Sequence, residues 1–126
     1  MNYIFFDIEC ANCQNGQAKI CSFGYVITDE SFTVLEKEDW IVNPKAPFLL
    51  TGHRNVPYIQ LAYDREEFRK APDFPRVYGQ IRDLLTRPDS LIFGYAADND
   101  AGYLRSEYER YQLPCVDFTY YDLQKL

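Results

Sequence analysis

Three runs rich in apolar, aromatic and β-branched residues occupy the first third of the chain, each bounded by polar residues. They cover residues 3–10, 18–30 and 32–43. The connections between them are short, and Pro44 and Pro47 follow the third run. Short runs of this composition predict strands, and short connections favour antiparallel pairing. The pattern therefore predicts a β-meander of three strands.

The second half of the chain alternates between helical and strand patterns. Asp64 and Glu67 resemble a helix-capping pair before a short helix that Pro72 ends. The elements predicted after it are a helix over 74–88, a strand over 90–96, a helix over 100–114 and a strand over 115–122. The apolar run 90–96 lacks alternation, which is typical of a strand covered on both faces. Residues 48–63 show no clear period and fit a short helix and a loop.

The predicted order is β-β-β-α-β-α-β. Strands joined by crossover helices pair in parallel, so this order predicts an α/β fold with a mixed sheet, in which an antiparallel meander joins parallel strands. In such sheets ligands gather at the carboxyl ends of the parallel strands. The first strand ends there, and so does the strand over 90–96.

Two carboxylates stand at the end of the first strand. Asp7 and Glu9 share one face because side chains alternate along a strand. One interpretation is a strand that runs into solvent, where both acids are hydrated. The other is a site in which a cation offsets their repulsion. Asp98 and Asp100 follow the strand over 90–96, and a site at this edge of the sheet would bring one of them toward the first pair.

Composition limits the class of protein. The chain has 126 residues, of which 47% are hydrophobic, and this predicts one folded domain over 1–126. No apolar run reaches the length of a membrane span, so we expect no membrane partner and a cytoplasmic location. The net charge of −6 argues against binding nucleic acid by overall charge, yet bound divalent cations reverse the local sign.

The four cysteines do not form a recognisable metal motif. Cys10 and Cys13 make a C-x-x-C, which is compatible with half of a zinc site or with a redox pair. The single histidine, His53, has no partner motif nearby, and no helix is predicted directly after Cys13. We therefore interpret the cysteines as reduced structural residues and His53 as a loop residue.

Taken in order, these features resemble the DEDD superfamily of 3′–5′ exonucleases, which has a ribonuclease H-like fold. Residues 5–10, FFDIEC, are similar to the family's first motif, and residues 93–104, FGYAADNDAGYL, to its second. The end of the third strand and the stretch KAPDF also resemble the family. The second motif is more polar here than usual. We assign its acid to Asp100, because an apolar-faced helix continues from it, and interpret Asp98 as the helix cap.

The family's third motif, a His or Tyr with a following Asp on a later helix, has no counterpart before Leu126. We therefore expect a domain that lacks the family's C-terminal helices and is incomplete at its C-terminus. Either these residues are the front part of a longer protein, or the chain is an incomplete descendant of the family. One face of the sheet would then be exposed. This predicts low stability or self-association of the chain, and little or no nuclease activity of these residues alone.

The resemblance implies two Mg²⁺ or Mn²⁺ ions that promote hydrolysis of a phosphodiester. Asp7 would bridge both ions, Glu9 would hold the ion that activates water, and Asp100 would support the other. Carboxylates without His or Cys suit these hard cations. The catalytic and metal-binding residues implied are thus Asp7, Glu9 and Asp100.

The resemblance also implies the substrate. The partner would be the 3′ end of a single-stranded nucleic acid, with Cys10, Ala11 and Asn12 against the terminal nucleotide. The function implied is a metal-dependent 3′–5′ exonuclease, with DNA favoured. Two alternatives remain: an exoribonuclease acting on short RNA, and a non-catalytic domain of the same fold that binds nucleic acid or protein.

Overall fold

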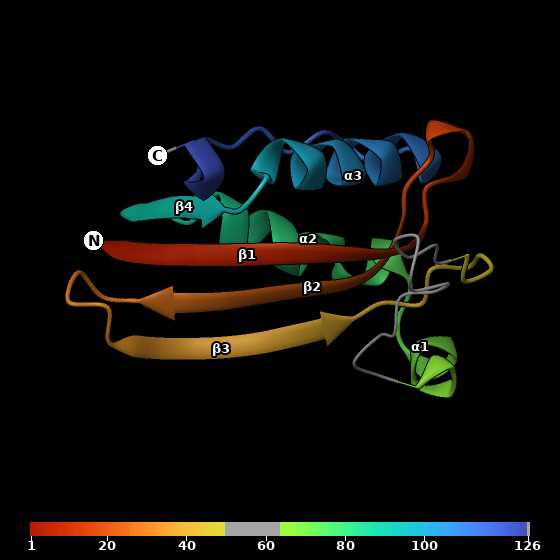
Figure 1. The fold of residues 1–126 in the computed structure, drawn as a ribbon, viewed down its shortest axis with the longest axis horizontal. Coiled ribbons are helices and arrows are strands. Elements are labelled where there is room, and N and C mark those ends of the chain that lie inside the picture. Colours follow the sequence, from red (N-terminus) through yellow and green to blue (C-terminus); the bar gives the residue numbers. More distant parts are fainter. Residues whose placement is uncertain (50–63, 126) are drawn as a thin grey trace, which may run out of the picture.

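A five-stranded mixed sheet organises the part of the chain that the structure describes. The structure is a computed structural model and describes residues 1–49 and 64–125. The strands are β1 (Asn2–Asn12), β2 (Lys19–Thr28), β3 (Val34–Ile41), β4 (Ser90–Gly94) and β5 (Tyr121–Asp122). Their order is β3-β2-β1-β4-β5, with β1, β2 and β3 antiparallel and β4 and β5 parallel to β1 (Figure 1). The predicted α/β mixed sheet with its meander is confirmed.

Three α-helices connect and cover the strands. They are α1 (Arg65–Lys70), α2 (Phe74–Leu85) and α3 (Ala97–Arg110), and two 3-10 turns, η1 (Gln14–Gly16) and η2 (Leu123–Lys125), complete the described elements. The predicted cap of α1 is confirmed, because the Asp64 carboxylate accepts a hydrogen bond from the Glu66 backbone N–H at 3.4 Å. Figure 1 shows α2 behind the sheet and α3 alongside β1.

The hydrophobic core lies between the two longer helices and one face of the sheet. Ile4, Phe6 and Ile8 of β1 are buried on this face, together with Ile81 of α2 and Leu104 of α3. Because side chains alternate along β1, the residues between them point to the opposite face. The two acids of β1 therefore lie on the face that α2 and α3 leave uncovered.

Aromatic side chains form a row across this uncovered face. The ring of Phe93 on β4 lies 5.3 Å from the ring of Phe5, 5.9 Å from that of Tyr3 and 5.6 Å from that of Tyr121. Tyr121 is 43% exposed, and Phe32, which contacts Tyr3, is 67% exposed. The prediction that residues 90–96 form a strand covered on both faces was wrong: its apolar run reflects a core on one face and this aromatic row on the other.

A tight turn joins β4 to α3. Gly94 lies against Phe6 and Ala97, and Ala96 adopts a left-handed conformation with φ of 55°. Ala96 is the N-cap residue of α3, and the interpretation of Asp98 as the cap was wrong. Asp98 lies inside the first turn, where its carboxylate accepts from the Tyr120 hydroxyl at 2.6 Å and from Lys125 at 2.7 Å. The helix begins earlier because the turn, rather than a side-chain cap, sets its start.

The last predicted strand is mostly irregular. Only Tyr121 and Asp122 pair with β4, and residues 115–120 form no ladder. Partly buried and exposed residues still alternate over 116–122, as they would along a strand. The Phe118 ring packs against the core residue Phe6, with 6.1 Å between the ring centroids.

Some predictions fall outside the described residues. His53 and the loop over 51–55 lie in the segment 50–63. In residues 1–49 and 64–125, no helix combines the length and the apolar character needed to cross a membrane.

The turn after β4 provides a test of the packing at Gly94. A Cβ atom on this residue would lie 3.0 Å from the Ala97 Cβ and 3.3 Å from the Phe6 ring. We expect Gly94→Ala to lower the free energy of unfolding by about 1–3 kcal/mol through overpacking, measured by urea denaturation. Gly79→Ala is the control, because its Cβ would meet only the Arg82 side chain, at 3.8 Å. Equal effects of the two substitutions would contradict this account.

The aromatic row provides a test of self-association. Contiguous exposed apolar surface favours contact between molecules, so we expect the chain to associate as its concentration rises, measured by sedimentation velocity. Phe93→Thr should weaken this association because Phe93 contacts three other rings of the row. Leu35→Thr removes an exposed apolar side chain outside the row and should have little effect. A wild-type chain that stays monomeric throughout would refute the expectation.

Candidate functional site

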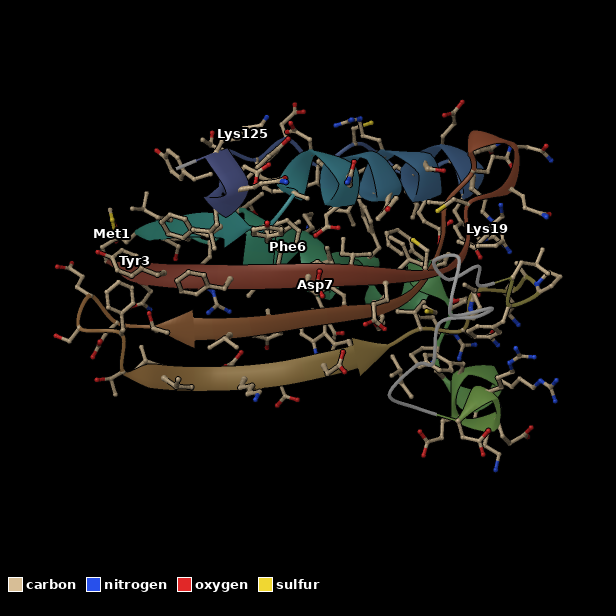
Figure 2. All side chains as sticks on the ribbon, viewed as in Figure 1. Met1, Tyr3, Phe6, Asp7, Lys19 and Lys125 are labelled. Carbon is tan, nitrogen blue, oxygen red and sulfur yellow. The ribbon has the colours of Figure 1, made fainter. Side chains whose placement is uncertain are left out.

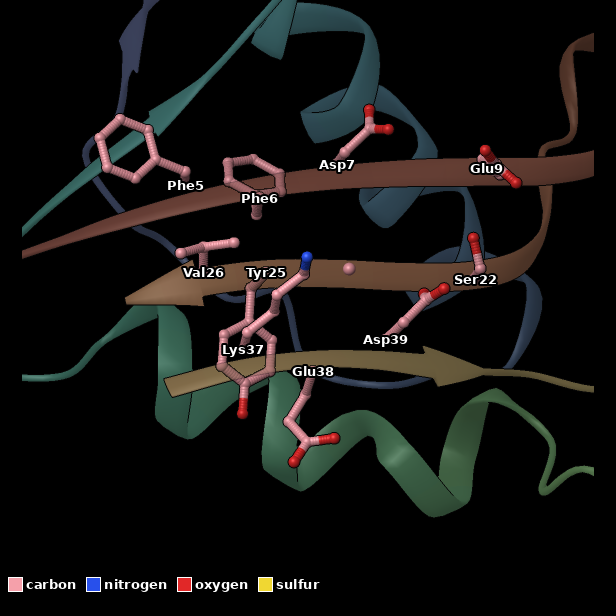
Figure 3. A pocket seen from close by; sticks show the side chains of 11 residues that line it. Phe5, Phe6, Asp7, Glu9, Ser22, Tyr25, Val26, Lys37, Glu38 and Asp39 are labelled. Atoms are coloured by element: carbon pink, nitrogen blue, oxygen red, sulfur yellow. The ribbon is translucent and has the colours of Figure 1, made fainter. Parts of the chain in front are cut away.

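Asp7 and Glu9 project from β1 onto the uncovered face of the sheet. Both side chains are exposed, whereas Phe6 and Ile8 beside them are buried. Figure 2 shows Asp7 about midway along β1, and Figure 3 shows both carboxylates on the same side of the strand. The predicted shared face of the two acids is thus confirmed.

Asp100 reaches the same strand from α3. The β1–β4 ladder ends where Phe5 pairs with Phe93, and α3 takes the place of β4 beside the rest of β1. The Ile8 backbone N–H forms a hydrogen bond with the Asp100 carboxylate. Asp100, and not Asp98, is therefore the acid of α3 that meets β1.

The environment of Asp100 opposes its ionisation. The residue is only 5% exposed, and its Oδ2 atom is buried without a hydrogen-bond partner among the described residues. Burial raises the pKa of Asp100 to about 7, the negative charge of Asp7 adds to this, and the hydrogen bond from Ile8 opposes it. A cation at this place would relieve both the repulsion and the unpaired oxygen.

Glu9 is also surrounded by negative charge. Although its side chain is exposed, partial desolvation by the neighbouring residues raises its pKa above the ordinary value. The charges of Asp7 and Asp39 raise it further, while a hydrogen bond from the Ser22 hydroxyl lowers it. Asp39 belongs to β3, and the register of the sheet places Gly24 between Asp7 and Asp39. Asp7 and Asp39 therefore face each other across a residue without a side chain.

The missing side chain at Gly24 contributes to a hollow of about 370 Å³ on the uncovered face (Figure 3). Phe5 and Val26 form an apolar part of it, and Asp7, Glu9 and Asp39 form an acidic part. Figure 3 shows the Lys37 amine extending over β2 into the same hollow. The hollow thus offers an apolar surface and carboxylates side by side.

The fit of these residues to divalent cations is partial. The negative charge of Asp7 raises the pKa of both Glu9 and Asp100, so Asp7 is close enough to interact with both acids. In the described ranges, no three carboxylate, thiol or imidazole groups converge on a point that one metal ion would occupy. The carboxylate donors and the unpaired Asp100 oxygen suit Mg²⁺ or Mn²⁺.

The segment predicted to contact a terminal nucleotide is largely occupied within the protein. Ala11 is fully buried, and its carbonyl accepts from the Leu49 N–H at 2.9 Å. The Asn12 amide donates to the Pro47 carbonyl at 2.7 Å, and its side-chain oxygen accepts from the Gln14 N–H at 3.2 Å. Cys10 is partly buried. Contact of Cys10, Ala11 and Asn12 with substrate stays a prediction.

Several residues near the site were not found from the sequence. Asp122 raises the pKa of Asp100, and its Oδ1 atom accepts from the Ala96 N–H at 2.9 Å and the Gln124 N–H at 3.0 Å. Its place at the end of the last predicted strand was a usable signal, because that end lies at the same edge of the sheet. Asp39 required the register between strands, which the sequence does not provide.

Similar folds occur among solved structures. A product-bound structure of exonuclease I matches 97% of this chain with a TM-score of 0.70 and 22% identity, and this covers 30% of that chain. E. coli exonuclease I in complex with a dT13 oligonucleotide matches 97% of this chain, with a TM-score of 0.68 and 20% identity. A metal-free E. coli exonuclease I–single-stranded DNA complex matches 98%, with a TM-score of 0.69 and 20% identity.

These similarities establish the fold. The α/β mixed sheet of ribonuclease H-like fold that is predicted from the sequence is confirmed, and the matches cover 97% of the chain. The chain spans less than a third of the length of these neighbours. No family model and no curated protein matches the sequence.

The raised pKa of Asp100 predicts how stability depends on pH. Between the unfolded pKa of about 3.9 and the folded value of about 7, the folded state holds a proton that the unfolded chain releases. The contribution of Asp100 to stability therefore falls as pH rises through this interval and stays low above it. Without metal, we expect the free energy of unfolding of Asp100→Asn, relative to that of wild type, to increase by up to about 3 kcal/mol from pH 5 to pH 8. Urea denaturation at the two pH values measures this change.

Asp98→Asn is the matched control on the same helix. Hydrogen bonds from Lys125 and Tyr120 lower the pKa of Asp98, so its removal should bring no gain in stability toward pH 8. If the stability difference between wild type and Asp100→Asn were the same at pH 5 and pH 8, the burial of Asp100 against Asp7 would be excluded.

Proposed function

We propose that this chain carries part of the active site of a metal-dependent 3′–5′ exonuclease that acts on single-stranded nucleic acid, with DNA favoured. The observation that carries the proposal is the placement of the buried, incompletely partnered Asp100 beside Asp7. Glu9 adds a third carboxylate on the same strand as Asp7. The similarity of the fold to that of exonuclease I supports the proposal.

The proposed ligands of divalent cations are Asp7, Glu9 and Asp100. Bound Mg²⁺ or Mn²⁺ would supply an activated water and offset the charge that develops on phosphate and leaving oxygen. Asp7 is the shared ligand, because it is the acid next to both of the others. Further ligands would complete the coordination, since three groups of the described residues do not converge on one ion.

The chain's own residues prepare this site in two ways. With its pKa raised to about 7, Asp100 is partly protonated near neutral pH, and the proton must leave before its carboxylate binds a cation. A hydrogen bond from the Ser22 hydroxyl to Glu9 favours the charged form of Glu9. Metal binding is therefore expected to strengthen as pH rises through about 7.

The substrate class rests on the fold and on the hollow beside the acids. The similar exonuclease I structures include complexes with single-stranded DNA. In this chain, Phe5 and Val26 offer an apolar surface next to Asp7, and Lys37 offers a positive charge within an acidic surrounding. A base and a phosphate of one nucleotide require these two kinds of contact.

A non-catalytic binding domain is the second candidate. This candidate is favoured because, among the described residues, no three possible metal ligands converge on one position. The two candidates differ in what they require of the acids: catalysis needs cation binding at Asp7, whereas a binding domain does not.

Metal binding therefore tests the proposal. An ion that binds only the folded state stabilises it, so Mn²⁺ should raise the thermal midpoint of the wild-type chain, measured by differential scanning calorimetry at pH 8. Asp7→Ala should lose this response because it removes the shared ligand. Asp117→Ala, at an exposed position on the segment after α3, should keep it.

Shortening of an oligonucleotide provides the second readout. A 5′-labelled single DNA strand incubated with Mn²⁺ should shorten from its 3′ end, slowly because only part of the ligand set is supplied, and Asp7→Ala should abolish this. An RNA strand of the same sequence compares the two substrates. Equal Mn²⁺ shifts in wild type and Asp7→Ala would exclude the metal site and leave the binding domain.

A further inference from the structure

A second acid lies on the buried face of α3. Glu107 is 0% exposed and stands seven residues after Asp100, on the same side of the helix as the core residues Leu104 and Tyr108. A buried carboxylate costs several kcal/mol of desolvation unless its partners offset it. An apolar residue at this position would pack without that cost, so the partners of Glu107 are informative.

Glu107 connects α3 to two other segments. Its Oε2 atom accepts a hydrogen bond from the Ile20 backbone N–H at 3.3 Å, and its Oε1 atom accepts from Arg110 at 3.2 Å. Arg110 in turn donates to the Lys45 carbonyl at 3.1 Å. Both oxygens of the buried carboxylate are thus engaged, one by β2 and one by a cation that reaches the segment after β3.

The residue before Glu107 makes a parallel contact. The Ser106 hydroxyl accepts a hydrogen bond from the Ala18 backbone N–H at 2.9 Å. Two consecutive side chains of α3 therefore bind the backbone at the beginning of β2. Ile20 pairs with Cys10 of β1, so these contacts attach the helix to the end of β1 that carries Glu9.

These hydrogen bonds fix the position of α3 along its own axis, which hydrophobic packing constrains only weakly. Burial of Leu104 and Tyr108 holds α3 against the sheet, but apolar contact is non-directional and sets its position along its own axis only weakly. Hydrogen bonds to Ala18 and Ile20 are directional and set this position. Seven residues of helix, a rise of about 10.5 Å, then fix where Asp100 meets β1.

We propose that Glu107 is a positioning residue for the acidic site: by binding Ile20 and Arg110, it sets the axial position and rotation of α3 and so holds Asp100 against Ile8 and Asp7. The role in metal binding rests on the proposed function. The docking of Asp100 on β1 does not, and it is measured separately.

Three substitutions test the proposal. Glu107→Met removes both hydrogen bonds and keeps the size of the side chain, and replacement of a buried ion pair by an apolar residue is often tolerated. Glu107→Gln keeps one acceptor for the Ile20 N–H and is the conservative rescue. Glu109→Gln removes a charge from an exposed position of the same helix and is the matched control.

The first readout is amide hydrogen exchange of Ile8 without metal. We expect Glu107→Met to exchange this amide about tenfold faster than wild type, relative to the amides of the β1–β2 ladder, which report global stability. The second readout is Mn²⁺ affinity by calorimetry at pH 8. We expect about tenfold weaker binding for Glu107→Met, a smaller loss for Glu107→Gln, and wild-type values for Glu109→Gln.

A purely structural role would lower the thermal midpoint of Glu107→Met while leaving the relative Ile8 exchange and the Mn²⁺ affinity of the folded chain unchanged, and this result would overturn the proposal. So would equal effects of Glu107→Met and Glu109→Gln. If wild type binds no Mn²⁺, the proposed function fails, and the Ile8 exchange alone decides whether Glu107 positions Asp100. Should Glu107→Met not fold, Ser106→Ala must show the same faster Ile8 exchange, or the proposal fails.

Discussion

The burial of Asp100 beside the negative charge of Asp7 is the constraint on which the arrangement of the acidic site depends. Asp100 is buried whereas Asp7 is exposed, and the burial of Asp100, with the negative charge of Asp7 added, raises its pKa and so opposes its ionisation in the fold. The pair persists because α3 is held from both ends. The turn at Gly94 and Ala96 fixes where the helix starts, and Ser106 and Glu107 bind the beginning of β2.

The one-sided cover of the sheet follows from the same arrangement. α2 and α3 bury Ile4, Phe6 and Ile8, and the alternation of β1 then leaves Phe5, Asp7 and Glu9 on the open face. A strand whose two faces are both rich in large side chains is stable when both faces are covered. The aromatic row beside the acids is therefore the surface on which a further contact, within a longer protein or with another molecule, would add the most stability.

The sequence allowed the fold to be predicted because local patterns determine most of it. The period of two placed Asp7 and Glu9 on one face, and the helix continuing from Asp100 identified the acid that meets β1. The start of α3 was not predictable from capping residues, since an alanine with a left-handed backbone occupies the cap. Asp39 joins the site through strand register, which depends on contacts distant in sequence. Asp122 could have been included from its place at the end of the last predicted strand.

The two buried acids of α3 show why such a site resists prediction from composition. Asp100 and Glu107 lie on the same side of the helix, about two turns apart. The spacing of apolar residues along the helix does not predict a buried acid at either position. Their partners separate them: Glu107 has an arginine and a backbone N–H, whereas Asp100 keeps one oxygen unpaired beside another acid. The hydrogen bonds of the buried Glu107 hold α3 in place. The unpaired oxygen of Asp100 then lies where a bound cation would be its partner.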